Sequence, residues 1–282
     1  MGAMRSKRGK MNYKIVASDI DGTLLNTDSQ LSEKNISAIS RLGKLGMHFV
    51  PATGRTLSEI PPEVLSCSDI RYIIQSNGAA VTDRISGEQI RLCIGCDAAK
   101  RLLDILFKYD AHLTVRHGGE SYAGKLTDYV VKHNKVDKNH VAVIQRYANF
   151  PTNFKEVVYS LDYIEVVSAY FPSEDERQSC RAEIESLGEC RTAQVGEHGL
   201  EIFDKSAGKG AALLALSEWL GVDRTESIGV GDSGNDITLV QAAGLGLAVK
   251  NATDELKGVA DEVICSNDEG AIDYILKHFC ES

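Results

Sequence analysis

The sequence predicts an α/β fold in which a core with a parallel sheet is interrupted by an inserted α+β domain. Two observations lead to this prediction. Apolar strand-like runs alternate with helical patterns at both ends of the 282-residue chain, which is typical of parallel strands joined by helices. In the middle, strand-like runs often follow one another directly. We therefore expect a core of residues 11–85 and 197–282 and an inserted domain of residues 86–196.

The first half of the predicted core has the order strand, helix, strand, helix, strand. Residues 13–17 form an apolar run, and apolar residues recur at helical spacing over residues 32–45, with Ser32 at the expected N-cap. The segments "MHFVPAT" and "RYIIQSN" predict two further strands, separated by a helix that Pro61 and Pro62 interrupt. This order predicts a parallel sheet.

The inserted domain and the second half of the core differ in pattern. A hairpin turn is predicted at Ser86-Gly87. Beyond it, helices are predicted over residues 98–109 and 174–187, and strands over residues 111–116, 162–168 and 191–195. From Lys209 the segments "KGAALLALSEWLGV", "ESIGVGD", "NDITLVQAAG" and "LGLAV" predict helix, strand, helix and strand. A closing helix over residues 269–278 completes the core.

Composition narrows the classes of partner and compartment. The chain has 31 Lys and Arg against 40 Asp and Glu, a formal charge of -9, so we expect no nucleic-acid partner. No run reaches the roughly 18 apolar residues of a membrane helix, so we expect no membrane partner. Seven cysteines without a regular framework favour a cytoplasmic location. Residues 1–10, "MGAMRSKRGK", are expected to be a flexible tail and not a signal peptide.

Polar residues gather directly after several predicted core strands. The clusters are Asp19 with Asp21, Thr53 with Gly54 and Arg55, Ser76 with Asn77, and Asp232 with Asn235 and Asp236. In an open parallel sheet the carboxyl ends of the strands line one crevice, so these residues are predicted to converge.

The residue types in this crevice predict a metal and a phosphate. Crowded carboxylates resist ionisation unless a cation neutralises them, and an all-oxygen site suits Mg2+. Thr53, Ser76 and Asn77 add neutral hydrogen-bonding groups, and Lys209 adds positive charge at a predicted helix N-terminus. Taken singly, each cluster also fits an ordinary turn or cap. Their repetition at successive strand ends favours a site.

Two glycine-containing patterns point elsewhere and are weak. Residues 229–234 satisfy G-x-G-x-x-G, but the pattern comes late in the chain, and its loop holds Asp232, which opposes a pyrophosphate. The segment "AGKGA" lacks the first glycine and the final Ser or Thr of a P-loop. A dinucleotide-dependent oxidoreductase is therefore disfavoured.

The motifs together resemble a known family. "DIDGT" at 19–23, "ATGR" at 52–55, "SNGA" at 76–79, "KG" at 209–210 and "GDSGND" at 231–236 resemble the haloacid dehalogenase superfamily, in particular its Cof-type phosphatases of subclass IIB. The resemblance implies a Rossmann-like parallel-sheet core, with the inserted segment as a type IIB cap.

The resemblance also implies roles for individual residues. Asp19 is the implied nucleophile that forms an aspartyl-phosphate, and Asp21 is the implied general acid that later activates water. The implied Mg2+ site consists of Asp19, Asp21, Asp232 and Asp236. Asp21 would bind the ion through its backbone carbonyl, and Asp236 would either bind the ion itself or hold the residues that bind it. The implied phosphate-binding residues are Thr53, Gly54, Lys209 and Asn235.

We therefore expect a Mg2+-dependent phosphatase that hydrolyses small phosphomonoesters such as sugar phosphates, as a monomer or small homo-oligomer. The alternatives are a phosphomutase of the same superfamily and a catalytically weak regulator that binds sugar phosphates. In the expected cap, Arg116, His117, Tyr122 and Lys125 are polar enough to touch a sugar, but an exposed loop explains them equally well.

Overall fold

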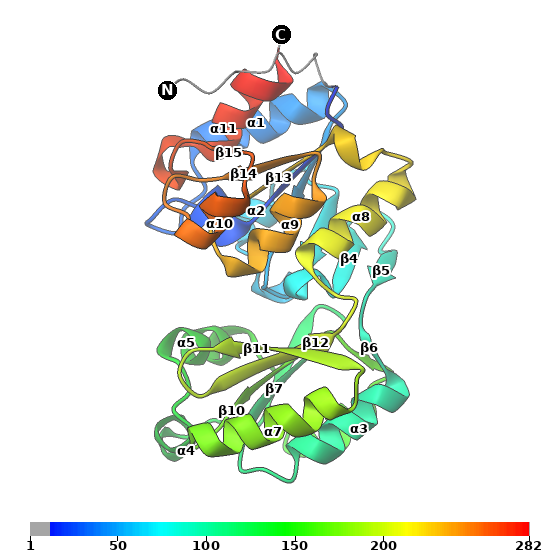
Figure 1. Ribbon diagram of the computed structural model, residues 1–282, viewed down its shortest axis with the longest axis vertical. Coiled ribbons are helices and arrows are strands. Elements are labelled where there is room, and N and C mark those ends of the chain that lie inside the picture. The colour runs from blue at the N-terminus through cyan, green and yellow to red at the C-terminus, as the bar shows by residue number, and fades with distance from the viewer. Residues whose placement is uncertain (1–11, 282) are drawn as a thin grey trace.

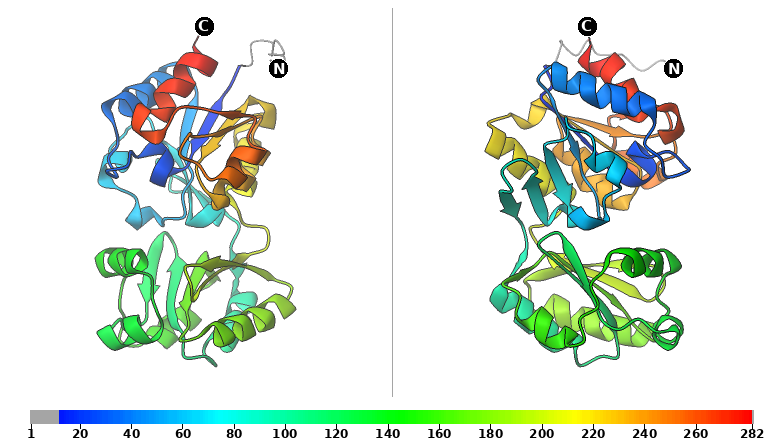
Figure 2. Two further views of the ribbon diagram at one scale, coloured as in Figure 1. Left: turned by 60° about the vertical axis from the view of Figure 1, so that its left-hand side comes forward. Right: turned by 180° about the vertical axis from the view of Figure 1, so that it is seen from behind.

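The computed structural model describes residues 12–281, so the predicted tail at 1–10 lies outside the described residues. Two lobes are stacked along the long axis of the molecule (Figure 1), and the views turned by 60° and from behind show the same separation (Figure 2). We call the lobe built from both ends of the chain the core lobe and the lobe built from its middle the cap lobe. The mixed α/β architecture predicted from the sequence is confirmed.

The core lobe is built on a parallel five-stranded sheet of order β15-β14-β13-β1-β2. Its strands are β1 (Ile15–Ser18), β2 (His48–Pro51), β13 (Ser227–Gly231), β14 (Leu245–Ala248) and β15 (Glu262–Val263). β1 and β13 are buried throughout, because helices cover both faces of a parallel sheet. The two halves of the chain therefore meet at the centre of one sheet.

A short antiparallel sheet extends this core. It consists of β3 (Tyr72–Gln75), β4 (Ala80–Asp83) and β5 (Gln89–Arg91). An isolated parallel bridge between Ala52 and Ile74 places β3 beside the end of β2. The third strand predicted for the core is therefore present, although its continuous pairing is to β4.

Helices on both faces of the core sheet complete the lobe. They are α1 (Glu33–Lys44), α2 (Pro62–Leu65), α8 (Lys209–Leu220), α9 (Ile237–Ala242), α10 (Asp254–Val259) and α11 (Ala271–Ile275). The Ser32 hydroxyl accepts a hydrogen bond from the Asn35 N–H and caps α1, as predicted. The predicted closing helix begins slightly later and continues from α11 into a wider turn, Leu276–Cys280.

No helix among residues 12–281 is long and apolar enough to span a membrane.

The cap lobe is built on an antiparallel sheet of order β11-β12-β10-β7-β8. Its strands are β7 (His112–His117), β8 (Glu120–Ala123), β10 (Val166–Tyr170), β11 (Cys190–Val195) and β12 (Gly199–Asp204), and β6 (Ile94–Gly95) pairs with β9 (Tyr163–Ile164). Helices α3 (Cys96–Leu106) and α7 (Glu174–Ser186) pack on the sheet face turned away from the core lobe (Figures 1 and 2). Helices α4 (Asp128–His133), α5 (Lys138–Tyr147) and α6 (Phe154–Tyr159) were not predicted.

Strand pairing places the borders of the inserted segment later than residues 86 and 196. β5 pairs with β4 and belongs to the core lobe. β12 pairs with β10 and β11 and belongs to the cap sheet. We propose domain borders after Arg91 and after Asp204. The proposed second border lies after the predicted one because the turn at Gly196 joins the paired strands β11 and β12 and does not end the sheet.

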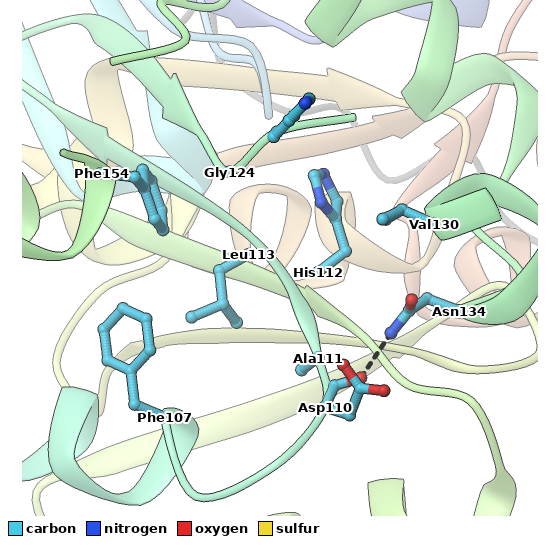
Figure 3. Close-up of a pocket in the computed structure, with 10 residues that line it drawn as sticks. Phe107, Asp110, Ala111, His112, Leu113, Gly124, Val130, Asn134 and Phe154 are labelled. Carbon is cyan, nitrogen blue, oxygen red and sulfur yellow. Dashed lines mark hydrogen bonds between the residues drawn. The ribbon is translucent and has the colours of Figure 1, made fainter. Parts of the chain in front are cut away.

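A small hollow of about 170 Å3 lies inside the cap lobe, away from the core (Figure 3). It is lined by Phe107, Asp110, Ala111, His112, Leu113, Gly124, Lys125, Val130, Asn134 and Phe154. Burial lowers the pKa of His112 to about 4, and its Nε2 has no hydrogen-bond partner among the described residues. The folded cap therefore holds this imidazole in its neutral form at pH 7.

The buried His112 makes stability depend on pH. Its pKa is lowered from 6.5 in the unfolded chain to about 4 in the folded one, so the unfolded chain binds more protons between these values. The stability associated with keeping His112 neutral is fully present above pH 6.5, and it is lost as the pH falls toward 4. Between pH 7 and pH 5 the free energy of unfolding should fall by about 2 kcal/mol through this group. Urea unfolding of wild type and His112→Gln checks this, with the exposed His278→Gln as control. An equal fall in His112→Gln would contradict the assignment.

Candidate active site

One cavity of about 350 Å3 lies where the core strands end and the cap lobe faces them. The core contributes residues after β1, β2 and β13, because the carboxyl ends of parallel strands meet at one edge of the sheet. The lining residues are Asp19, Asp21, Thr53, Gly54, Arg55, Glu59, Asn77, Arg116, His140, Val143, Val195, Glu201, Ser233 and Asn235. Lys209 lines an adjoining hollow, and Asp232 and Asp236 lie beside Asp19. The structure thus brings together the residues predicted for the metal and phosphate sites, whereas Ser76 lines neither hollow and is buried.

A buried ion-pair cluster forms the floor of this site. Lys209 is the first residue of α8, and its Nζ lies 2.5 Å from Asp19 Oδ1 and 2.6 Å from Asp236 Oδ1. Oxygen atoms of Asp19, Asp232 and Asp236 lie within 4.8 Å of one another. One ammonium therefore faces three carboxylates, and the floor carries excess negative charge.

This excess charge shifts the protonation equilibria. Burial raises the pKa of Asp19 well above its ordinary value, Lys209 partly opposes this, and Asp236 adds to the rise. Burial and then Asp236 also raise the pKa of Asp232. Although burial opposes it, the two carboxylates that Lys209 contacts raise the pKa of its ammonium. With all three carboxylates ionised, Lys209 neutralises one of three negative charges, which leaves an excess of two that a divalent cation can balance.

The carboxylate of Asp236 is fully engaged by the protein. Its Oδ1 accepts from Lys209, and its Oδ2 accepts from the backbone N–H groups of Asp232 at 3.0 Å and Ser233 at 3.1 Å. These N–H groups belong to the G-x-G-x-x-G loop, so the donors that would hold a dinucleotide pyrophosphate are already used by a carboxylate. The loop orders the acidic cluster and does not present a nucleotide site.

Arg55 holds Asp21 in a two-pronged ion pair. Its Nε and Nη2 each lie 2.8 Å from an oxygen of Asp21, and its Nη1 donates to the carbonyl of Glu59 at 2.8 Å. Asp21 remains half exposed to the cavity, whereas Asp19 is buried. The two aspartates of the first motif thus lie in different environments, a buried one beside a lysine and an open one beside an arginine.

The Ser76-Asn77 segment connects the site to the cap lobe. The Ser76 hydroxyl donates to Glu165 Oε2 at 2.5 Å, and Asn77 Nδ2 donates to Glu201 Oε2 at 3.1 Å. Asn77 Oδ1 accepts from Asn235 Nδ2 at 3.1 Å. Asn77 therefore joins a predicted phosphate-binding residue of the core to a carboxylate of the cap.

Several lining residues were missed from the sequence. Of the four polar cap residues considered there, Arg116 lines the cavity, and Lys125 lines the separate hollow in the cap. Glu59, His140 and Glu201 were not considered, since each stands in an ordinary helical or strand context without a motif. Arg55 was placed in the predicted crevice through the "ATGR" motif, but no role was predicted for it.

The comparison with known families decides the identity of the chain. A family model described as haloacid dehalogenase-like hydrolase matches residues 16–276. The chain belongs to this family. The resemblance inferred from the five motifs is confirmed, and the protein is a haloacid dehalogenase-like hydrolase.

Individual relatives of this family match over nearly the whole chain. Phosphatase YwpJ of Bacillus subtilis is 27% identical, over 94% of this chain and 99% of its own. The B. subtilis 5-amino-6-(5-phospho-D-ribitylamino)uracil phosphatase YwtE is 28% identical, over 93% of this chain and 96% of its own. The solved structure of the HAD subclass IIB sugar phosphatase BT4131 has a TM-score of 0.76 at 21% identity, over 94% of this chain and 98% of its own. The fold is that of subclass IIB.

Gly78 is required where the third motif meets α8. Its φ is +86°, and a Cβ there would lie 2.6 Å from the Lys209 backbone N and collide with the Gly208 carbonyl. We expect Gly78→Ala to displace the start of α8 and to destabilise the fold by at least about 1 kcal/mol more than a left-handed alanine alone. Urea unfolding and phosphate release measure both effects.

Gly87→Ala provides the matched control for this substitution. Gly87 has φ +77°, and a Cβ there meets nothing within 4 Å. It therefore carries the backbone cost without the collision. Equal destabilisation in the two variants would show that the contact with α8 is unimportant.

Proposed function

We propose that the protein is a Mg2+-dependent phosphatase that hydrolyses small phosphomonoesters, sugar phosphates among them, through an aspartyl-phosphate. The observation that carries this proposal is the buried Asp19, held against Lys209 at 2.5 Å at the floor of the cavity. A carboxylate fixed beside a cation is a positioned nucleophile, and the ammonium is placed to neutralise phosphoryl charge.

The acidic cluster fits the proposed Mg2+ site. All its donors are oxygens, its charge exceeds that of Lys209, and Gly22 packs so closely that a Cβ there would lie 2.7 Å from Asp232 Oδ2. Asp19, Asp232 and the backbone carbonyl of Asp21 would hold the ion. Because both oxygens of Asp236 are already engaged, we assign it to positioning Lys209 and the loop. When bound, Mg2+ would stabilise the negative charge that develops on the phosphoryl oxygens.

The chain's own residues account for both halves of the reaction. Asp19 attacks phosphorus and forms the aspartyl-phosphate as the bond between phosphorus and the leaving oxygen breaks. Asp21, in its protonated form and released from Arg55, gives that oxygen its proton. Asp21 then accepts a proton from the water that hydrolyses the intermediate. Arg55 keeps Asp21 at the edge of the cavity between these steps. Lys209, Thr53, Asn235 and the backbone of Gly54 bind the phosphoryl oxygens.

The names of the relatives support a small phosphorylated substrate. YwpJ is named a phosphatase, and YwtE is named for a phosphorylated ribitylamino-uracil. A phosphomutase of the same family is the second candidate, because it would use the same aspartate and return the phosphoryl group to a sugar. Quantifying inorganic phosphate against isomerised sugar phosphate separates the two. The regulator hypothesis, the cytoplasmic location and a monomer or small homo-oligomer stay predictions.

Asp19→Asn tests the nucleophile. The substitution keeps the shape of the side chain and removes the attacking oxygen, so Mg2+-dependent phosphate release should fall by at least about 10³-fold while the protein stays folded. Phosphate release from a panel of sugar phosphates and p-nitrophenyl phosphate measures this, with Asp28→Asn as the exposed control. Full activity in Asp19→Asn would rule out the aspartyl-phosphate route.

Mg2+ binding is testable without turnover. Because the ion would relieve repulsion in the cluster, 10 mM Mg2+ is expected to raise the Tm of the wild type by about 2–4 °C. Asp232→Asn should lose most of this shift and bind Mg2+ at least about tenfold more weakly by calorimetry. An unchanged shift in this variant would place the metal elsewhere.

A further inference from the structure

Arg116 occupies the cap side of the cavity with unused hydrogen-bonding capacity. It lies on β7, it is buried, and its Nη1 donates to the carbonyl of Gly54 at 3.1 Å. Its Nη2 is 3.9 Å from Glu59 Oε2, beyond hydrogen-bond distance, and its Nε has no hydrogen-bond partner among the described residues. A buried guanidinium without its full set of partners is costly in a folded protein. This side chain is therefore a candidate ligand contact.

Carboxylates compensate the charge of this arginine. Glu201 Oε1 lies 3.6 Å from Arg116 Nη1, and Glu59, Glu201 and Glu165 together raise the pKa of the guanidinium despite its burial. The neighbouring His140 is neutral at pH 7, because burial and Arg116 lower its pKa to about 4. The cap side of the cavity therefore offers donors and acceptors without a net positive charge.

Glu201 supplies the acceptor half of this arrangement. Its Oε2 accepts from Asn77 at 3.1 Å, which fixes the carboxylate, and a carboxylate oxygen has more than one acceptor site. Arg116 on β7 and Glu201 on β12, the strands on either side of β10, thus present a donor and an acceptor that line the cavity beside Gly54 and Asn77. Vicinal hydroxyls match such a pair, because one hydroxyl accepts from the guanidinium while the next donates to the carboxylate.

We infer that Arg116 and Glu201 are the specificity-determining pair for the leaving group and that they select neutral, polyhydroxylated leaving groups over anionic ones. This inference rests on the proposed function. A second phosphate or a carboxylate on the substrate would lie near Glu201 and Glu59 as well as Arg116. Repulsion by the two carboxylates would offset its attraction to Arg116, so the free-energy cost of desolvating the anion would remain. A leaving group without hydroxyls would leave both members of the pair without new partners.

Kinetics with matched substrates test the pair. Sorbitol 6-phosphate carries neutral hydroxyls, 6-phosphogluconate adds a carboxylate, and phenyl phosphate carries neither. We expect wild type to prefer sorbitol 6-phosphate to 6-phosphogluconate by at least about tenfold in kcat/KM. Arg116→Lys and Glu201→Gln should lower kcat/KM for sorbitol 6-phosphate by about 10- to 100-fold, mainly through KM. The loss for phenyl phosphate should be at least about fivefold smaller, because it comes only through the contacts of the pair with Gly54 and Asn77.

Glu201→Gln gives the sharper outcome, because it removes the negative charge while keeping the shape. Its preference for sorbitol 6-phosphate over 6-phosphogluconate should shrink at least about fivefold relative to wild type. Arg101→Met, which removes an exposed cap arginine paired with Glu189, is the charge control and should behave as wild type. Equal losses on sorbitol 6-phosphate and phenyl phosphate, or an unchanged preference in Glu201→Gln, would overturn the inference.

The phenyl phosphate arm separates this inference from the proposed function. If wild type releases phosphate from none of the three esters, the phosphatase proposal fails. The role of Arg116 and Glu201 is then tested by calorimetry, which gives the Kd of sorbitol 6-phosphate for wild type and both variants. Inorganic phosphate is the reference ligand. Weaker binding of sorbitol 6-phosphate but not of inorganic phosphate in both variants supports the pair, and equal weakening of the two ligands contradicts it.

Discussion

The buried contact of Lys209 with Asp19 and Asp236 is the interaction on which the site depends. It joins the end of β1 to the start of α8 and to the loop after β13, so it fixes three strand and helix ends relative to one another. Such a buried pair gives little net stability, because desolvation offsets most of the Coulomb attraction, but losing one partner leaves an unpaired charge that costs about 3–5 kcal/mol. The cluster is therefore retained for the placement of charge, which is what phosphoryl transfer requires.

The core was predictable because its signals are local. Strands buried on both faces appear as short apolar runs, and the helix after β1 carries its own cap at Ser32. The cap was less predictable, since α4, α5 and α6 are short and take their bounds from packing on the antiparallel sheet. β12 has a short apolar stretch of Leu200, Ile202 and Phe203 broken by Glu201, which predicted no element from the sequence. Only its pairing with β10 and β11 places it in the cap.

The same distinction explains which site residues were found. Asp19, Asp21 and Asp232 belong to compact motifs in which the spacing itself carries the chemistry. Arg116 and Glu201 lie far apart in the sequence, and each looks like an ordinary polar residue of a strand. Only the folding of β7 and β12 into one sheet brings their charged groups to 3.6 Å. Residues that we propose to act on the phosphate are thus predictable from motifs, whereas residues that we propose to face the leaving group depend on the tertiary structure of the cap.

The contact between the lobes suits a cap that moves. Among the described residues it includes a small apolar cluster of Ala79, Val166 and Ala207, with partly buried hydrophobic residues packed on it, and polar contacts such as Ser76 with Glu165. Interfaces of this composition are typical of domains that open and close. Ser76 and Asn77 have φ of 50° and 54°, a strained backbone for residues other than glycine. Hydrogen bonds from this segment to the cap offset the strain when the lobes meet. Asn77 also contacts Asn235, so one strained segment connects the phosphate-binding side of the cavity to the carboxylate that faces the leaving group.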